Sequence, residues 1–122
     1  MAGMAILRAR FKLWIELDGE PLLGEGGYEL LRAVEEVGSI MGACRRLRLS
    51  YRKAMSYLRK MEQRLGRKMV RTRKGGRGGG GAELTEDCRE LLDAYEALKL
   101  AVEKTLKEKA PPILGSLWAR GS

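Results

Sequence analysis

Histidine is absent from this 122-residue chain, and cysteine occurs only twice. Cys44 and Cys88 have no histidine to join them in a zinc site, so no metal site is expected. Both cysteines fall on segments with helical spacing and are expected to be small, buried apolar side chains. Ser50 has no base partner that we can identify. The sequence therefore gives no basis for an enzyme, a catalytic residue or a cofactor.

Long hydrophobic runs are also missing. No uncharged apolar stretch approaches the roughly 20 residues that span a bilayer, and the N-terminal apolar stretch is too short for a signal peptide. We therefore expect a soluble, cytoplasmic protein. With 44% hydrophobic residues, a chain of this length can bury one core, which predicts one domain with an appended helix.

Positive charge is concentrated in one part of the sequence. Between residues 44 and 77 there are 14 Lys or Arg and one acid, Glu62, so the local net charge is 14 − 1 = +13 in a chain whose total is +8. Lys and Arg that neutralise phosphates release condensed counterions and gain affinity in this way. The segment therefore predicts a nucleic-acid partner. For Arg45, Arg46 and Arg48 taken alone, a solvated helix face remains an equally good explanation.

Hydrophobic periodicity predicts a mainly helical fold with small β-hairpins. Residues largely alternate between apolar and polar from Phe11 to Leu17, and Asp18-Gly19 suits a tight turn to a second strand over 20–23. We expect Gly26-Gly27 to break the pattern before the first helix and Pro111-Pro112 to end the last one. The predicted helices are residues 28–37, 40–47, 51–65 and 85–109, and a second strand pair is residues 68–73 and 82–84.

Two serines predict a helix-turn-helix. Ser39 and Ser50 each stand where an N-cap residue precedes a helical segment, and a three-residue junction separates the two helices. The polar face of the third helix would then meet base edges in the major groove. The residues predicted to bind DNA in this motif are Ser39, Ser50, Tyr51, Arg52, Lys53, Ser56 and Arg59.

The second strand pair would carry the glycine run of residues 75–81 at its tip, which predicts a wing. Glycine lets the backbone approach a phosphate closely, and Arg71, Arg73, Lys74 and Arg77 are predicted to bind DNA there. A flexible linker is the alternative, because glycine-rich segments behave as coil. The run also satisfies G-x-G-x-x-G, but any glycine tract does so, and no long βαβ unit surrounds it.

The last predicted helix is longer than a small core can bury, which predicts a homodimer. Its apolar residues recur at steps of three and four, as in a coiled coil. The predicted dimer interface consists of Cys88, Leu91, Leu92, Tyr95, Leu98 and Val102. The alternative is an intramolecular core helix. The expected organisation is a winged helix-turn-helix domain over residues 1–84, a dimerisation helix over 85–110 and a tail over 111–122.

These motifs carry a family resemblance. The segment from Ser39 to Gly66 resembles the winged helix-turn-helix of LysR-type regulators. Ser50-Tyr51-Arg52-Lys53-Ala54, followed by the glycine run and Leu84-Thr85, is closer still to the DNA-binding domain of the ModE family of molybdate-responsive transcription regulators. The resemblance implies a DNA-binding homodimer joined through the long helix.

ModE-type regulators carry C-terminal oxyanion-binding domains, and this chain ends about where those would begin. Molybdate binding is therefore not transferred to it. An effector would act through a separate effector-binding chain, or the protein would be constitutive or differently regulated.

We accordingly expect a sequence-specific, double-stranded DNA-binding transcription regulator that acts as a homodimer at sites with dyad symmetry. A sequence-independent architectural or nucleoid protein, or an RNA-binding module, could use the same basic face. A protein-interaction adaptor built on the long helix is the third possibility.

Overall fold

The computed structural model of the chain describes residues 6–74 and 80–118. Its elements are β1 (Ile15–Leu17), β2 (Glu20–Leu23), α1 (Glu25–Val37), α2 (Ile40–Leu47), α3 (Tyr51–Leu65), β3 (Val70–Arg73), β4 (Gly81–Leu84) and α4 (Glu86–Gly115). In the described residues the strands form two separate antiparallel pairs, β1–β2 and β3–β4. The predicted class, mainly helical with small hairpins, is confirmed. Among these helices, none combines the length and apolar character that a membrane crossing requires.

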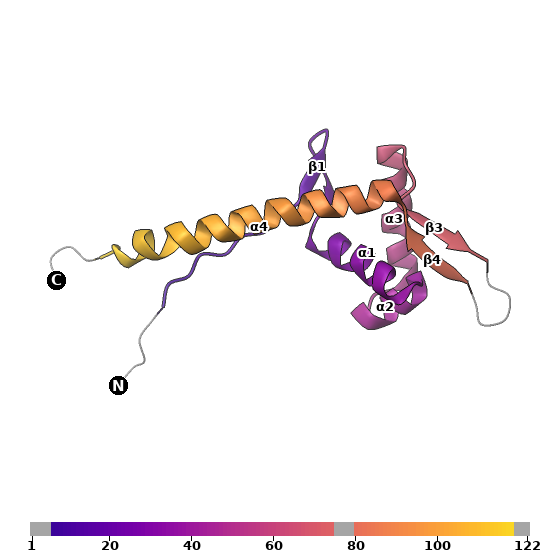
Figure 1. Cartoon of the computed structure of the whole chain (residues 1–122), viewed down its shortest axis with the longest axis horizontal. Helices are drawn as coiled ribbons and strands as arrows, with labels where there is room; N and C mark the ends of the chain where they lie inside the picture. Colours follow the sequence, from indigo (N-terminus) through magenta and orange to yellow (C-terminus); the bar gives the residue numbers. More distant parts are fainter. Residues whose placement is uncertain (1–5, 75–79, 119–122) are drawn as a thin grey trace.

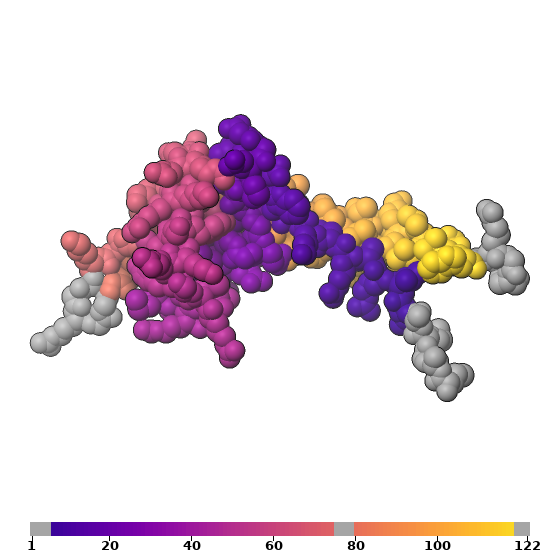
Figure 2. Space-filling model, turned by 180° about the vertical axis from the view of Figure 1, so that it is seen from behind, coloured from indigo at the N-terminus to yellow at the C-terminus, as the bar shows by residue number. Residues whose placement is uncertain are grey.

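The second half of α4 projects from the rest of the molecule, with the extended N-terminal segment running beside it (Figure 1). The other helices and both hairpins gather around the first half of α4. The view from behind in Figure 2 shows the same separation, with α2 and α3 on the outer surface at the broad end of the molecule. This arrangement leaves α3 and the β3–β4 hairpin accessible at one end.

One core joins the three shorter helices to α4. Every described element except β1 contributes fully buried apolar side chains to it. Tyr95 of α4 stacks on Tyr28 of α1, with ring centroids 5.0 Å apart. Cys44 and Cys88 are free and buried in this core, which confirms the prediction of two buried apolar cysteines.

The N-terminal hairpin has the predicted turn but a shorter first strand. Asp18 and Gly19 both have positive φ, +50° and +80°, as the two central residues of a tight hairpin turn require. Only Ile15–Leu17 of the predicted strand over residues 11–17 is paired, because β2 is four residues long and offers the earlier residues no partner. The Leu13 carbonyl instead accepts a hydrogen bond from the Tyr95 hydroxyl at 3.0 Å.

The first helix begins at Glu25, so the expectation that Gly26-Gly27 would break the pattern before it is wrong. Packing requires glycine at position 27, because a Cβ there would lie 2.0 Å from the Tyr57 hydroxyl oxygen of α3. That hydroxyl donates a hydrogen bond to the Leu22 carbonyl at 3.0 Å. A Cβ at Gly26 would meet no described atom within 4 Å. Gly27 thus allows α3 to lie against α1 and the N-terminal hairpin.

Replacing Gly27 with alanine should destabilise the fold by about 1–3 kcal/mol, because the new methyl group overpacks the contact with Tyr57. The matched variant Gly26→Ala should instead stabilise it by about 0.5–1 kcal/mol, since alanine is the better helix residue in open space. Urea unfolding followed by circular dichroism measures both changes. If the two variants were equally stable, the close approach of Tyr57 would not be what requires glycine.

The helix α4 starts as predicted and ends later than predicted. The Thr85 hydroxyl accepts a hydrogen bond from the Cys88 amide at 3.1 Å, which confirms the predicted N-cap. The helix continues to Gly115, so the expected end at Pro111-Pro112 is wrong and the tail predicted over residues 111–122 begins too early. Each proline removes one hydrogen bond to a carbonyl four residues earlier. In the projecting half of α4, water can hydrogen-bond those carbonyls.

Candidate nucleic-acid interface

The helix-turn-helix is formed by α2 and α3, and both predicted serine caps are present. The Ser39 hydroxyl oxygen accepts a hydrogen bond from the Gly42 amide at 2.8 Å, and the Ser50 hydroxyl oxygen accepts one from the Lys53 amide at 3.3 Å. An N-cap of this kind satisfies a backbone donor that the helix itself leaves unpaired. The caps therefore define where α3 begins and which of its side chains form the first turn.

The helix α3 divides into a buried side and an exposed side. Ala54, Leu58 and Met61 are buried in the core, as the apolar spacing predicts. All the α3 residues predicted to bind DNA are exposed, and Met55 is half-buried against the core. A shallow, open hollow on the exposed side is lined by Arg52, Lys53, Ser56, Arg59, Lys60 and Gln63. The sequence prediction thus selected side chains that the fold brings together on one surface.

Glu62, the only acid on α3, faces the wing. Its carboxylate accepts hydrogen bonds from the Met69 amide at 2.7 Å and the Val70 amide at 3.2 Å, and the Lys68 ammonium lies 3.9 Å away. Hydrogen bonds to a charged acceptor are among the stronger ones in proteins. Glu62 therefore ties the start of β3 to the end of α3. The prediction gave it no role, although a lone acid in a strongly basic segment was the available signal.

The predicted wing is a β-hairpin. Four residues of β3 pair with four of β4, and the Ala82 amide donates a hydrogen bond to the Gly38 carbonyl at 2.8 Å, which anchors β4 beside the start of α2. Arg71, Arg73 and Lys74 are exposed on the first strand side of the hairpin. The tip, including Arg77, lies outside the described residues, so its predicted DNA contact stays a prediction.

Arg77 aside, four of the basic residues between positions 44 and 74 are paired with carboxylates of the described chain. The pairs are Arg46 with Glu36, Arg64 with Glu20 at 3.1 Å, Arg67 with Asp87 at 3.3 Å and Lys68 with Glu62 at 3.9 Å. Arg64 also donates hydrogen bonds to the Leu17 and Pro21 carbonyls, so it joins α3 to the N-terminal hairpin.

Nine basic residues of this segment are exposed and make no ion pair within residues 6–74 and 80–118. They are Arg45, Arg48, Arg52, Lys53, Arg59, Lys60, Arg71, Arg73 and Lys74. They come from the end of α2, the exposed side of α3 and the wing. Unpaired cations grouped in this way favour an anionic, extended ligand.

Residues 27–89, just over half of the chain, match the sequence profile of the bacterial regulatory helix-turn-helix proteins of the lysR family. The chain belongs to this family. It is 37% identical over 84 residues to the molybdenum-pterin-binding protein MopB of Rhodobacter capsulatus, covering 69% of this chain and 31% of MopB. It is 30% identical over 110 residues to the transcriptional regulator ModE of Haemophilus influenzae, covering 88% of this chain and 43% of ModE.

A solved structure, described as a CbnR_DBD–DNA complex, resembles this lysR-family chain with a TM-score of 0.51 and 27% identity. The similarity covers 70% of this chain and 93% of that one. The predicted resemblance to LysR-type and ModE-family regulators is confirmed. The chain spans less than half the length of the two curated relatives named here.

In this lysR-family chain an ion-pair network joins α1 to α4. Arg32 contacts Asp93 at 3.1 Å and Glu96 at 3.0 Å across the two helices, and Glu35 at 3.1 Å on its own helix. The pKa of Arg32 is raised, most strongly by its hydrogen bond with the Tyr28 hydroxyl and further by its hydrogen bonds with these carboxylates. The network holds the first half of α4 against α1.

The chain's own core takes up half of the predicted dimer interface. Cys88, Leu92 and Tyr95 are fully buried against the shorter helices, which corrects the prediction for these three residues. The physical reason is that this stretch of α4 covers the core with the same apolar face that a coiled coil would use. Leu91 is half-buried against the core, whereas Leu98 is 50% exposed and lies beyond it.

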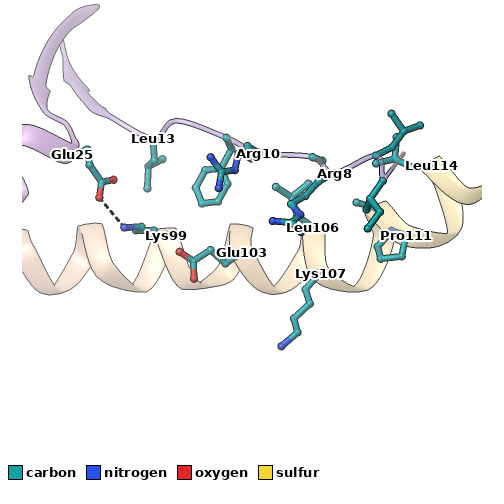
Figure 3. A pocket seen from close by; sticks show the side chains of 15 residues that line it. Arg8, Arg10, Leu13, Glu25, Lys99, Glu103, Leu106, Lys107, Pro111 and Leu114 are labelled. Atoms are coloured by element: carbon teal, nitrogen blue, oxygen red, sulfur yellow. Dashed lines mark hydrogen bonds and ion pairs between the residues drawn. The ribbon is translucent and has the colours of Figure 1, made fainter. Parts of the chain in front are cut away.

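The projecting half of α4 and the N-terminal segment line an open groove of about 840 Å³ (Figure 3). Phe11, Leu106 and Leu114 contribute apolar lining, and charged side chains stand around it. At one end of the groove the Lys99 ammonium pairs with a Glu25 carboxylate oxygen at 2.9 Å, and this contact lowers the pKa of Glu25. The ion pair fastens the start of α1 to α4.

Proposed function

We propose that this chain is a transcription regulator that binds double-stranded DNA sequence-specifically as a homodimer. The observation that carries the proposal is the group of nine exposed basic side chains that have no ion-pair partner among the described residues, gathered on the helix-turn-helix and wing of a lysR-family domain. DNA supplies the complementary row of phosphates. In this arrangement α3 enters the major groove and the wing lies on the neighbouring backbone.

The first turn of α3 has the chemistry to read bases. Arg52 can donate two hydrogen bonds to guanine, and Tyr51 and Ser56 can reach base edges or phosphates from the same surface. The bonds from Glu62 to β3 hold the wing at a set position relative to α3. Both elements can therefore contact one duplex at the same time.

A homodimer is supported by the apolar surface of α4 that the core leaves uncovered. Leu98 is half exposed and Ile113 is 62% exposed, and both lie in the part of α4 that follows Tyr95, its last fully buried residue. Pairing two copies through this part of α4 would place two α3 helices on one face of a duplex, as a site with dyad symmetry requires.

The recognition role of α3 is tested by Arg52→Ala. Affinity for the preferred duplex, selected from a random-sequence library, should fall by about 1–3 kcal/mol, because a base contact is lost. Affinity for unrelated duplex should change little. Fluorescence anisotropy titrations with both duplexes measure the two constants.

The matched control is Arg67→Ala, which removes the same charge from a residue that already pairs with Asp87 and should leave both affinities nearly unchanged. Equal losses on both duplexes in Arg52→Ala would mean that Arg52 holds a phosphate. If selection enriched no sequence at all, the chain would be a sequence-independent DNA-binding protein.

A further inference from the structure

The helix α2 ends in a backbone conformation that favours glycine, yet the residue there is Arg48. Its φ is +57° and its ψ is +43°, in the left-handed region. The corresponding C-cap residues of α1 and α3 are Gly38 and Gly66, with φ of +80° and +67°. A side chain in this region strains the backbone, and such strain is concentrated at functional positions.

The helix end itself does not use the arginine side chain. The Arg48 amide donates a hydrogen bond to the Arg45 carbonyl at 3.3 Å, and the Leu49 amide donates one to the Cys44 carbonyl at 2.9 Å. These two backbone bonds form a Schellman ending, in which glycine is the favoured residue at this position. Glycine would therefore close α2 with the same bonds and less strain.

The Arg48 side chain is also unused by the rest of the described fold. It is exposed, and its guanidinium makes no hydrogen bond or ion pair with residues 6–74 or 80–118. It stands in the junction that leads into α3, two residues before the Ser50 cap and four before Arg52. Exposed Arg45 lies one turn earlier on α2.

We infer that Arg48 binds a phosphate of the DNA backbone beside the bases that face the first turn of α3. The inference rests on the proposed DNA-binding function. A guanidinium is suited to a phosphate because it presents several donors in a fixed plane. The contact accounts for an arginine at a position where the fold alone favours glycine.

Attraction to the C-terminus of α2 is the competing explanation, because cations are favoured there. Arg45 and Arg46 already place two cations in the last turn of this helix. The two explanations predict opposite effects of Arg48→Gly on stability. If Arg48 serves to bind phosphate, Arg48→Gly should make the protein more stable, because glycine relieves the backbone strain. If Arg48 stabilises the helix end, the same substitution should make the protein less stable.

The experiment compares wild type with Arg48→Gly, Arg48→Lys and the control Asp18→Gly. Asp18 is another described residue with positive φ, but it lies in the β1–β2 turn. Thermal unfolding gives the melting temperature, and anisotropy titrations over a range of salt concentrations give the affinity for the selected duplex and for an unrelated one. Both duplexes are needed because a phosphate contact is independent of sequence.

We expect Arg48→Gly to raise the melting temperature by a few degrees. It should weaken binding to both duplexes by about tenfold and reduce the magnitude of the slope of log K against the logarithm of the salt concentration by about 0.9. Arg48→Lys should keep most of the slope, and Asp18→Gly should not weaken binding. Unchanged binding, a loss confined to the selected duplex, or a lower melting temperature would overturn the inference. Wild type that binds no duplex would instead overturn the proposed function.

Discussion

The affinity of this chain for DNA should fall by roughly three to five orders of magnitude when salt is raised from about 50 to 200 mM, as six to ten phosphate contacts predict. The expectation follows from the nine exposed basic residues of the helix-turn-helix and wing that are unpaired within the part of the chain that the structure describes. Each cation that neutralises a phosphate releases bound counterions, and added salt opposes this release. Anisotropy titrations of a labelled duplex at several salt concentrations give the slope directly.

Single variants show whether the slope comes from the proposed surface. Arg59→Ala, on the exposed side of α3, should reduce the slope by about 0.9. Arg67→Ala should leave it nearly unchanged, because Asp87 already neutralises this arginine. A flat salt titration of the wild-type chain would contradict the electrostatic basis of the proposal.

Replacing Leu98 with aspartate should convert the proposed dimer into a monomer. In a dimer formed through the part of α4 that follows Tyr95, Leu98 would be covered by the partner, and burying an unpaired carboxylate there is costly. In the single chain Leu98 is half exposed, so the monomer should keep its fold. Sedimentation gives the mass, and circular dichroism the helical content.

The loss of pairing should also weaken binding to a dyad site strongly, because two linked α3 helices bind their half-sites together. The half-sites are expected about 34 Å apart, one turn of DNA, or at a multiple of that distance. Leu100→Asp is the matched control, since residue 100 lies about 200° around the helix from residue 98 and should stay outside the seam. Wild-type chain that sediments as a monomer at tens of micromolar would defeat the dimer proposal.

Local signals in the sequence determined most of the helix-turn-helix. A serine cap, the apolar spacing that follows it and a glycine stop act within a few residues of one another, so Ser39, Ser50 and Gly66 mark α2 and α3 correctly without knowledge of the rest of the fold. The Asp18-Gly19 turn and the two strands of the wing are local in the same sense. The exposed side of α3 followed from the same spacing.

Contacts between distant residues decided what the sequence patterns could not. Gly27 reads locally as a helix breaker, and only the approach of Tyr57, thirty residues later, explains why glycine stands inside α1. The spacing of Cys88, Leu92 and Tyr95 suits an intermolecular seam as well as a core, and the packing of the shorter helices against α4 assigned these residues to the core.

The basic segment shows the same division between sequence and structure. Its composition alone established a strong positive charge, but the tertiary structure decided which cations remain for a ligand, because partners such as Asp87 and Glu20 come from other elements. It also placed Glu62 against the backbone of β3 and put Arg48 in a left-handed conformation. Charge is a property of the sequence, whereas its availability depends on which groups the fold brings within a few ångströms.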